Sequence, residues 1–291
     1  MIAGLVLLAG GAAAGVFGSL LGLGGGILIV PLLTLVFGLP LREAVAVSLV
    51  SVIVTSSASA GVYLQRHTAN LRLGMVLELF TASGALVGGL VAFLLSDQVL
   101  AGLFAALLAW VAYSMLRAGA KAKASAAAAA AAAAVSAQAT DETTASAVAE
   151  PAEPAPGSFT ATLGGDGYTV HRLHAGMVGS VFAGLVSAIL GVGGGIVKVP
   201  VMNLVMGVPL KVATATSNMM IGITATSSAV IYLLRGQIDP YVAGPVALGV
   251  FAGAMVGSRI AARIDVRLLR WLFVIVLIYN AVQMGVRALA L

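Results

Sequence analysis

The sequence has no cysteine and very little charge. None of its 291 residues is Cys, and Asp, Glu, Lys and Arg together make up only 9% of them. The lack of thiols excludes disulfide frameworks, thiolate metal sites and thiol catalysis. The low charge, together with 60% hydrophobic residues, excludes an ordinary soluble domain of this length.

Motifs of well-known enzymes are also missing. The sequence contains no HExxH, no GxSxG and no Walker phosphate-binding loop. His171 and His174 are three residues apart but have no third ligand beside them, which favours a surface pair over a metal site. We therefore expect no enzymatic activity, no metal and no cofactor.

Long apolar runs are what the sequence has in abundance, and its mean hydropathy is +1.10. They far exceed the ten-residue alternating strands of an outer-membrane barrel. We expect an all-α polytopic membrane protein with about eight transmembrane helices, near residues 2–20, 43–64, 74–95, 99–116, 174–190, 212–234, 242–262 and 268–286. Two shorter segments, near 27–37 and 196–206, have about half of the ~20 residues that a spanning helix needs. Each is either the second part of a broken helix or one arm of a re-entrant hairpin.

The two halves of the sequence align with each other without a gap. A shift of 169 residues superimposes them from about residue 14 to residue 115. The matches include Gly38-Leu39-Pro40-Leu41 with Gly207-Val208-Pro209-Leu210, Thr55 and Tyr63 with Thr224 and Tyr232, and Gly84 and Gly88 with Gly253 and Gly257. Such agreement indicates two homologous repeats. We expect repeat 1 at 1–117, a flexible Ala/Pro-rich linker at 118–170 and repeat 2 at 171–291.

Each repeat contains a glycine-rich break inside an apolar stretch. The breaks are Gly22-Leu23-Gly24-Gly25-Gly26-Ile27 before Pro31, and Gly191-Val192-Gly193-Gly194-Gly195-Ile196 before Pro200. Paired broken segments at membrane depth indicate a transport site. Glycines let the backbone approach a ligand closely, and the N–H groups at the start of a helix attract anions. We therefore predict anion binding by Gly24, Gly25, Gly26, Ile27, Gly193, Gly194, Gly195 and Ile196. The alternative is that the glycines only permit a tight turn and close packing.

A polar stripe follows each break. Ser48, Ser51, Thr55 and Ser59 share one helix face, and Ser217, Thr224 and Ser228 repeat the pattern with Asn218 beside them. Such hydroxyls either bond to their own helix or line a substrate path. We predict a lining role for Ser48, Ser51, Thr55, Ser217, Asn218 and Thr224.

Two ionisable residues fall within the apolar segments. Lys198 follows the second break closely, where it adds positive charge to an anion site, unless it extends to the membrane surface. Glu78 lies near a helix start and has Ala247 as its counterpart. We regard Glu78 as a candidate for proton or cation coupling.

Stripes of small residues predict close helix packing. They are Gly84, Gly88 and Ala92, their counterparts Gly253, Gly257 and Ala261, and the face of Gly11, Gly15, Gly18 and Gly22, which matches Ser180, Gly184, Ser187 and Gly191.

Basic residues suggest an orientation. With four spans in each half, eight basic residues fall on one side and six on the other, which favours the termini and the linker inside the cell. Four spans in each half would make the repeats parallel, and an odd number would make them inverted.

The duplicated Gly-x-Gly-Gly-Gly-(x)4-Pro block, the following Gly-x-Pro-Leu and the Ala/Ser/Thr-rich helix resemble the TauE/SafE family of sulfite exporters. The resemblance covers both halves outside 118–170. It implies a carrier of small sulfur-containing anions, such as sulfite or sulfoacetate, in the bacterial inner membrane.

We therefore expect a secondary transporter that exports such anions by alternating access, with the breaks as hinges. Its partners are the anionic substrate and the lipid bilayer, and nucleic acid is not expected. A coupling ion, proton or sodium, and the oligomeric state stay open. The alternatives are a passive anion channel and a membrane partner that delivers a sulfur compound.

Overall fold

The computed structural model describes residues 2–21, 26–65, 69–136, 163–164, 168–260 and 266–290. Within these ranges the chain is helical and has no strand, which confirms the all-α prediction. The first half forms α1 (Ile2–Leu21), α2 (Gly26–Pro31), η1 (Leu32–Val36), α3 (Leu41–Gln65), α4 (Leu71–Ala92) and α5 (Asp97–Ser136). The second half forms α7 (Leu173–Leu190), α8 (Gly195–Pro200), η2 (Val201–Val205), α9 (Leu210–Leu234), α10 (Pro240–Ile260) and α11 (Val266–Ala290).

Six of the described helices are long and apolar enough to cross a membrane, namely α3, α4, α5, α7, α9 and α10. Shorter apolar windows lie in α1 (Gly4–Gly18) and α11 (Val274–Leu289). Large apolar side chains point outward from the bundle, as with Leu79, which is 72% exposed. Lipid is the solvent that suits such a surface, so the chain is a multi-pass membrane protein.

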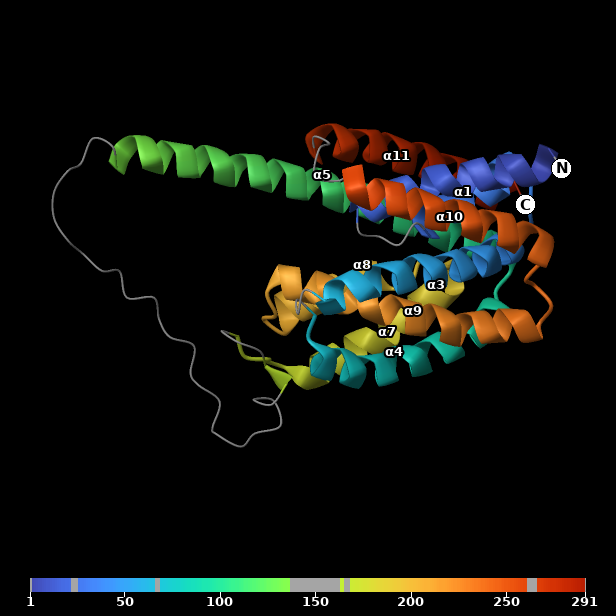
Figure 1. Ribbon diagram of the computed structural model, residues 1–291, viewed down its shortest axis with the longest axis horizontal. Helices are drawn as coiled ribbons and strands as arrows, with labels where there is room; N and C mark the ends of the chain where they lie inside the picture. Colours follow the sequence, from blue (N-terminus) through green and yellow to red (C-terminus); the bar gives the residue numbers. More distant parts are fainter. Residues whose placement is uncertain are drawn as a thin grey trace.

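The two halves interleave. α1 of the first half packs on α10 of the second, and α7 of the second packs on α4 of the first (Figure 1). α3 contacts α9, and α5 contacts α11. The apolar core therefore draws side chains from both halves, so neither half has a core of its own.

Glycine faces make these contacts close, as the small-residue stripes predict. A Cβ added to Gly88 on α4 would lie 2.6 Å from the carbonyl oxygen of Leu185 on α7, and one on Gly11 of α1 would lie 2.6 Å from that of Val246 on α10. A Cβ on Gly84 or Gly184 would collide with the backbone of the facing helix. Only glycine permits these crossings.

Corresponding helices of the two halves run in opposite directions. The colours in Figure 1 show α3 running away from the end that holds both chain termini, and α9 running toward it. The two chain termini therefore lie at one end of the described bundle, and the end of α5 and the start of α7 lie at the other. η1 also ends at the terminal end, where Arg287 near the end of α11 donates to the carbonyl of Thr34.

Each short helix changes from α-helical to π-helical hydrogen bonding after its proline. α2 and α8 end at Pro31 and Pro200, and each continues as a π-helix, η1 and η2. Proline has no N–H and crowds the preceding turn, so the α-helical bonding cannot continue unchanged. The hydroxyl of Thr34 donates to the carbonyl of Val30 at 2.9 Å, which satisfies an acceptor at this change.

Candidate functional site

The second glycine break has a backbone that only glycine adopts readily. Gly191, Gly193 and Gly194 all have positive φ, at 69°, 81° and 73°. Gly191 ends α7 and Gly194 precedes α8, so these residues turn the chain back between the two helices. In the first break, Gly24 and Gly25 lie outside the described residues, whereas Gly26 and Ile27 begin α2.

The two breaks meet at Ser48 of α3. Its hydroxyl lies 2.7 Å from the carbonyl oxygen of Gly191 and 3.2 Å from that of Gly26. It donates a hydrogen bond to the Gly191 carbonyl, and the Gly26 carbonyl is a second, more distant acceptor. A Cβ added to Gly26 would lie only 2.6 Å from the carbonyl oxygen of Gly191. Segments that are far apart in the sequence thus come into direct contact.

Two buried hydroxyls flank the second break. The side-chain oxygens of Ser187 and Ser217 are buried and have no hydrogen-bond partner among the described residues. Ser217 Oγ lies 3.5 Å from the Cβ position of Gly195, and Ser187 Cβ lies 3.3 Å from that of Gly194. Buried polar atoms in proteins normally have a partner, so these hydroxyls suit a polar ligand.

Sequence reasoning assigned Ser187 only to helix packing. The signal that could have identified it is a hydroxyl in a glycine face, since Gly18 is its counterpart in the first half.

The rest of the polar stripe bonds within or between helices. Ser51 donates to Val47 O at 3.0 Å and Thr55 to Ser51 O at 3.0 Å, both within α3. Ser56, which the sequence reasoning missed, donates to the backbone oxygen of Asn218 at 2.6 Å and so joins α3 to α9. Thus Ser48 contacts both breaks, whereas Ser51 and Thr55 donate to the carbonyl four residues earlier, as hydroxyls in helices commonly do.

Lys198, Glu78 and Thr224 form a buried cluster. Lys198 Nζ lies 3.1 Å from Glu78 Oε2 and donates to Thr224 Oγ1 at 2.6 Å. The Thr224 hydroxyl lies 2.7 Å from Glu78 Oε1. The side chains of Lys198 and Glu78 are only 1% and 6% exposed. The ammonium therefore does not extend to the membrane surface, and its charge is balanced by a residue of the other half.

This charged cluster lies beside the break rather than within it. Lys198 is one helical turn after Gly195, and its N–H donates to Gly194 O at 3.1 Å. Thr224 follows Ser217 by two turns of α9, or about 10 Å at 1.5 Å per residue. The unpartnered hydroxyls and the ion pair are thus neighbouring but distinct parts of one polar region.

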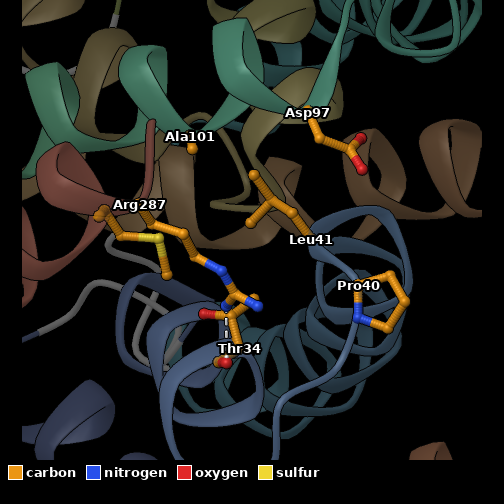
Figure 2. A pocket seen from close by; sticks show the side chains of 7 residues that line it. Thr34, Pro40, Leu41, Asp97, Ala101 and Arg287 are labelled. Carbon is orange, nitrogen blue, oxygen red and sulfur yellow. Dashed lines mark hydrogen bonds between the residues drawn. The ribbon is translucent and has the colours of Figure 1, made fainter. Parts of the chain in front are cut away.

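A small cavity of about 80 Å³ lies near the terminal end of the bundle, bounded by Thr34, Leu41, Asp97 and Arg287 (Figure 2). Arg287 donates to the carbonyl of Thr34 at 2.7 Å, which gives a hydrogen-bond partner to a carbonyl near the end of η1. Asp97 Oδ1 lies 2.9 Å from Arg42 Nη1, an ion pair without the alignment of a hydrogen bond. Arg287 and Asp97 therefore both make contacts at helix ends beside this cavity.

A larger cavity of about 500 Å³ is wholly apolar and lies between α5, α7 and α8. Ile196 and Val197 of the second break line it, together with Trp110 and Phe182. With no polar atom in its wall, it does not suit an anion.

Comparison with known proteins gives the chain a family. The family described as "Sulfite exporter TauE/SafE" matches residues 7–284. A protein of Bacillus subtilis (strain 168) described as "Probable membrane transporter protein YunE" is 26% identical over 288 residues, which is 96% of each chain. No solved structure matches the sequence. Since the family match spans nearly the whole chain and its helices have spanning length, the chain belongs to the TauE/SafE family of membrane transporters.

Proposed function

We propose that this protein is a secondary transporter that exports small sulfur-containing anions, such as sulfite or sulfoacetate, across the inner membrane. The observation that carries the proposal is the meeting of the two breaks at Ser48, beside the unpartnered hydroxyls of Ser187 and Ser217. An oxyanion accepts hydrogen bonds from hydroxyl and N–H donors, and this region offers both.

The backbone donors come from the starts of the short helices. In α8, the N–H groups of Val197 and Lys198 already donate to Gly194 O. The first N–H groups of a helix have no acceptor within it, so those of Gly195 and Ile196 are the donors we assign to the anion. By the correspondence of the halves, we assign Gly24, Gly25, Gly26 and Ile27 to the same role. Ser48, Ser51, Thr55, Ser217, Asn218 and Thr224 complete the proposed path.

We also propose that the chain has eight spanning helices arranged as two inverted repeats, with α1 and α11 as the seventh and eighth spans. The short helices add one returning pass to the four spans of each half, so that the number of passes in each half is odd. α2 and α8 begin at Gly26 and Gly195, and α3 and α9 begin at Leu41 and Leu210, each pair separated by the same shift of 169 residues. The opposite directions of these helices support inversion (Figure 1). In inverted repeats, alternating access follows when the two halves exchange conformations around a shared site.

We propose that the linker end of the bundle faces the cytoplasm and the terminal end faces outward. Nine described basic residues belong to the linker end, which are Arg72, Arg117, Lys121, Lys123, Arg172, Lys211, Arg259, Arg267 and Arg270. Three belong to the terminal end, which are Arg42, Arg235 and Arg287. Cytoplasmic segments carry the excess of Lys and Arg in membrane proteins.

Counterflow in proteoliposomes tests the function. Vesicles holding unlabelled sulfite should transiently accumulate labelled sulfite, because a carrier exchanges substrate across its two conformations. Unlabelled sulfoacetate, taurine, sulfate and chloride in the external medium then rank the specificity by competition.

Three outcomes separate the alternatives. Transient accumulation supports a carrier. Leakage of label without counterflow would instead mean an anion channel. No movement of sulfite or a sulfonate would reject this substrate class and leave open a role as a membrane partner that delivers a sulfur compound.

A further inference from the structure

We propose that Glu78 couples anion transport to protons: its carboxylate is the resident counterion of Lys198, and a substrate anion takes its place only when Glu78 binds a proton. This inference rests on the proposed function and deepens it. The observation behind it is the buried cluster in which Lys198 Nζ lies 3.1 Å from Glu78 Oε2.

Charge balance inside the protein gives the reason. Glu78 and Lys198 are buried and neutralise each other, and an unpaired charge in such surroundings is unfavourable. When one anionic group of the substrate enters beside them, one negative charge is in excess at the cluster. Protonation of Glu78 removes that excess, because the Lys198 ammonium then pairs with the substrate. One proton therefore binds to Glu78 for each anionic group of the substrate that pairs with the Lys198 ammonium.

The positions of the partners suit such an exchange. Lys198 lies on α8, the short helix that follows the second break, whereas Glu78 lies on α4 of the other half. Thr224 accepts from Lys198 and contacts Glu78 at 2.7 Å, so it can accept a hydrogen bond from the protonated carboxyl as well. A movement of α8 at its glycine hinge separates Lys198 from Glu78 without breaking the spanning helices.

Glu78 lies on α4, which packs against α7 and α9, and the other titratable groups of these helices do not contact it in the described structure. Arg72, His174 and Lys211 lie at the starts of α4, α7 and α9. Tyr232 of α9 donates to Ala188 O, and Tyr168 contacts the Asn70 side chain. Lys198 is therefore the charged group that Glu78 faces within the described residues.

The duplication sets the stoichiometry. The counterparts of Lys198 and Glu78 in the other half are Ile29 and Ala247, neither of which ionises. Among the described residues the pair therefore has no second copy in the repeat, so each turnover carries one coupled proton.

The test uses the full-length protein in proteoliposomes with sulfoacetate as the probe. Both acidic groups of sulfoacetate are ionised from pH 6 to pH 8, so its own charge does not follow the gradient, as that of sulfite does. With the membrane potential held at zero, one coupled proton predicts about tenfold accumulation for each unit of imposed pH difference. The internal pH should change as sulfoacetate moves.

Glu78→Gln removes the titrating group. The variant should still exchange sulfoacetate, because Lys198 keeps its charge, but a pH gradient should no longer drive accumulation. Glu43→Gln is the matched control, since Glu43 is a partly exposed carboxylate at the start of α3, and it should accumulate sulfoacetate as the wild type does.

The outcomes are distinguishable. Gradient-driven accumulation by Glu78→Gln would overturn the coupling role. If that variant does not fold, the wild type decides: net sulfoacetate uptake without a change of internal pH rejects coupling and leaves the transporter intact. Absence of any sulfur-anion movement in the wild type would reject the proposed function and this inference together.

Discussion

At the residue scale, the ion pair between Lys198 and Glu78 is almost completely buried. Removing one partner from a buried pair leaves the other charge uncompensated, at a cost of about 3–5 kcal/mol. We expect Lys198→Met to lower the unfolding temperature in detergent markedly, whereas Glu78→Leu combined with Lys198→Met should restore most of it. Thermal unfolding of the purified variants measures this, and equal losses in the single and double variants would contradict the pairing.

Ser48 and Ser217 make a second residue-scale prediction, because they occupy corresponding positions with different partners. Ser48→Ala removes the hydroxyl that joins the two breaks, and we expect a loss of about 1 kcal/mol in stability. Ser217→Ala removes a hydroxyl without a described protein partner, so stability should change little. Instead, the loss of a donor to the anion should raise the KM for sulfite by about 2–10-fold.

Each serine variant is the control for the other. Unfolding temperatures and counterflow kinetics, measured on both, separate a structural from a binding effect. A large stability loss in Ser217→Ala with an unchanged KM would remove Ser217 from the site.

The site residues show what the sequence could and could not provide. The glycine breaks and the buried lysine were predicted, because glycine in an apolar run and charge in a membrane are local signals. The partner of Lys198 was not predicted, since Glu78 lies 120 residues away and only the fold brings them together. Ser187 was assigned only to packing, because it lies in a stripe of small residues and only the structure shows that its buried hydroxyl has no described partner.

At the element scale, the sequence predicted every described helix to within a few residues except α5. The apolar pattern placed its end near 116, whereas the helix continues through the alanine run to Ser136. Alanine has the highest helix propensity, so a polyalanine segment extends a helix without any apolar pattern to mark it. The change to a π-helix after each proline was also missed, because it depends on how the following turn bonds.

Gly184 gives the element-scale prediction. A Cβ at this position would collide with the backbone of Thr81 on α4, so Gly184→Ala should force α4 and α7 apart and destabilise the protein by about 1–3 kcal/mol. Gly244→Ala is the matched control, because no atom lies within 4 Å of its Cβ position on α10. That change should leave stability unchanged or raise it by up to about 1 kcal/mol through helix propensity.

Thermal unfolding in the same detergent compares the two glycine variants. If both variants lose stability equally, the loss would follow from replacing any helical glycine by alanine. The close crossing of α4 and α7 would then not be its cause.

At the scale of the whole molecule, the sequence predicts a duplication but does not predict the relative direction of its two halves. Whether the repeats are parallel or inverted depends on the number of passes in each half, and a segment of half spanning length leaves that number open. In the structure, η1 ends at the terminal end, where Arg287 donates to Thr34 O, and this arrangement changes the side to which basic residues belong. The balance of eight to six derived from four passes becomes nine to three among the described residues.

This arrangement predicts which ends of the bundle can be labelled from outside the cell. The protein has no native cysteine, so single-cysteine variants report one position each. Leu289, which is 91% exposed, lies at the terminal end, and Leu210, which is 59% exposed, lies at the linker end. In spheroplasts, a membrane-impermeant maleimide should label Leu289→Cys directly and Leu210→Cys only after permeabilisation, because the excess of positive charge holds the linker end in the cytoplasm. The reverse pattern would invert the proposed orientation while keeping the fold. Labelling of both positions from one side would contradict the proposed odd number of passes, and with it the proposed inverted relation of the two halves.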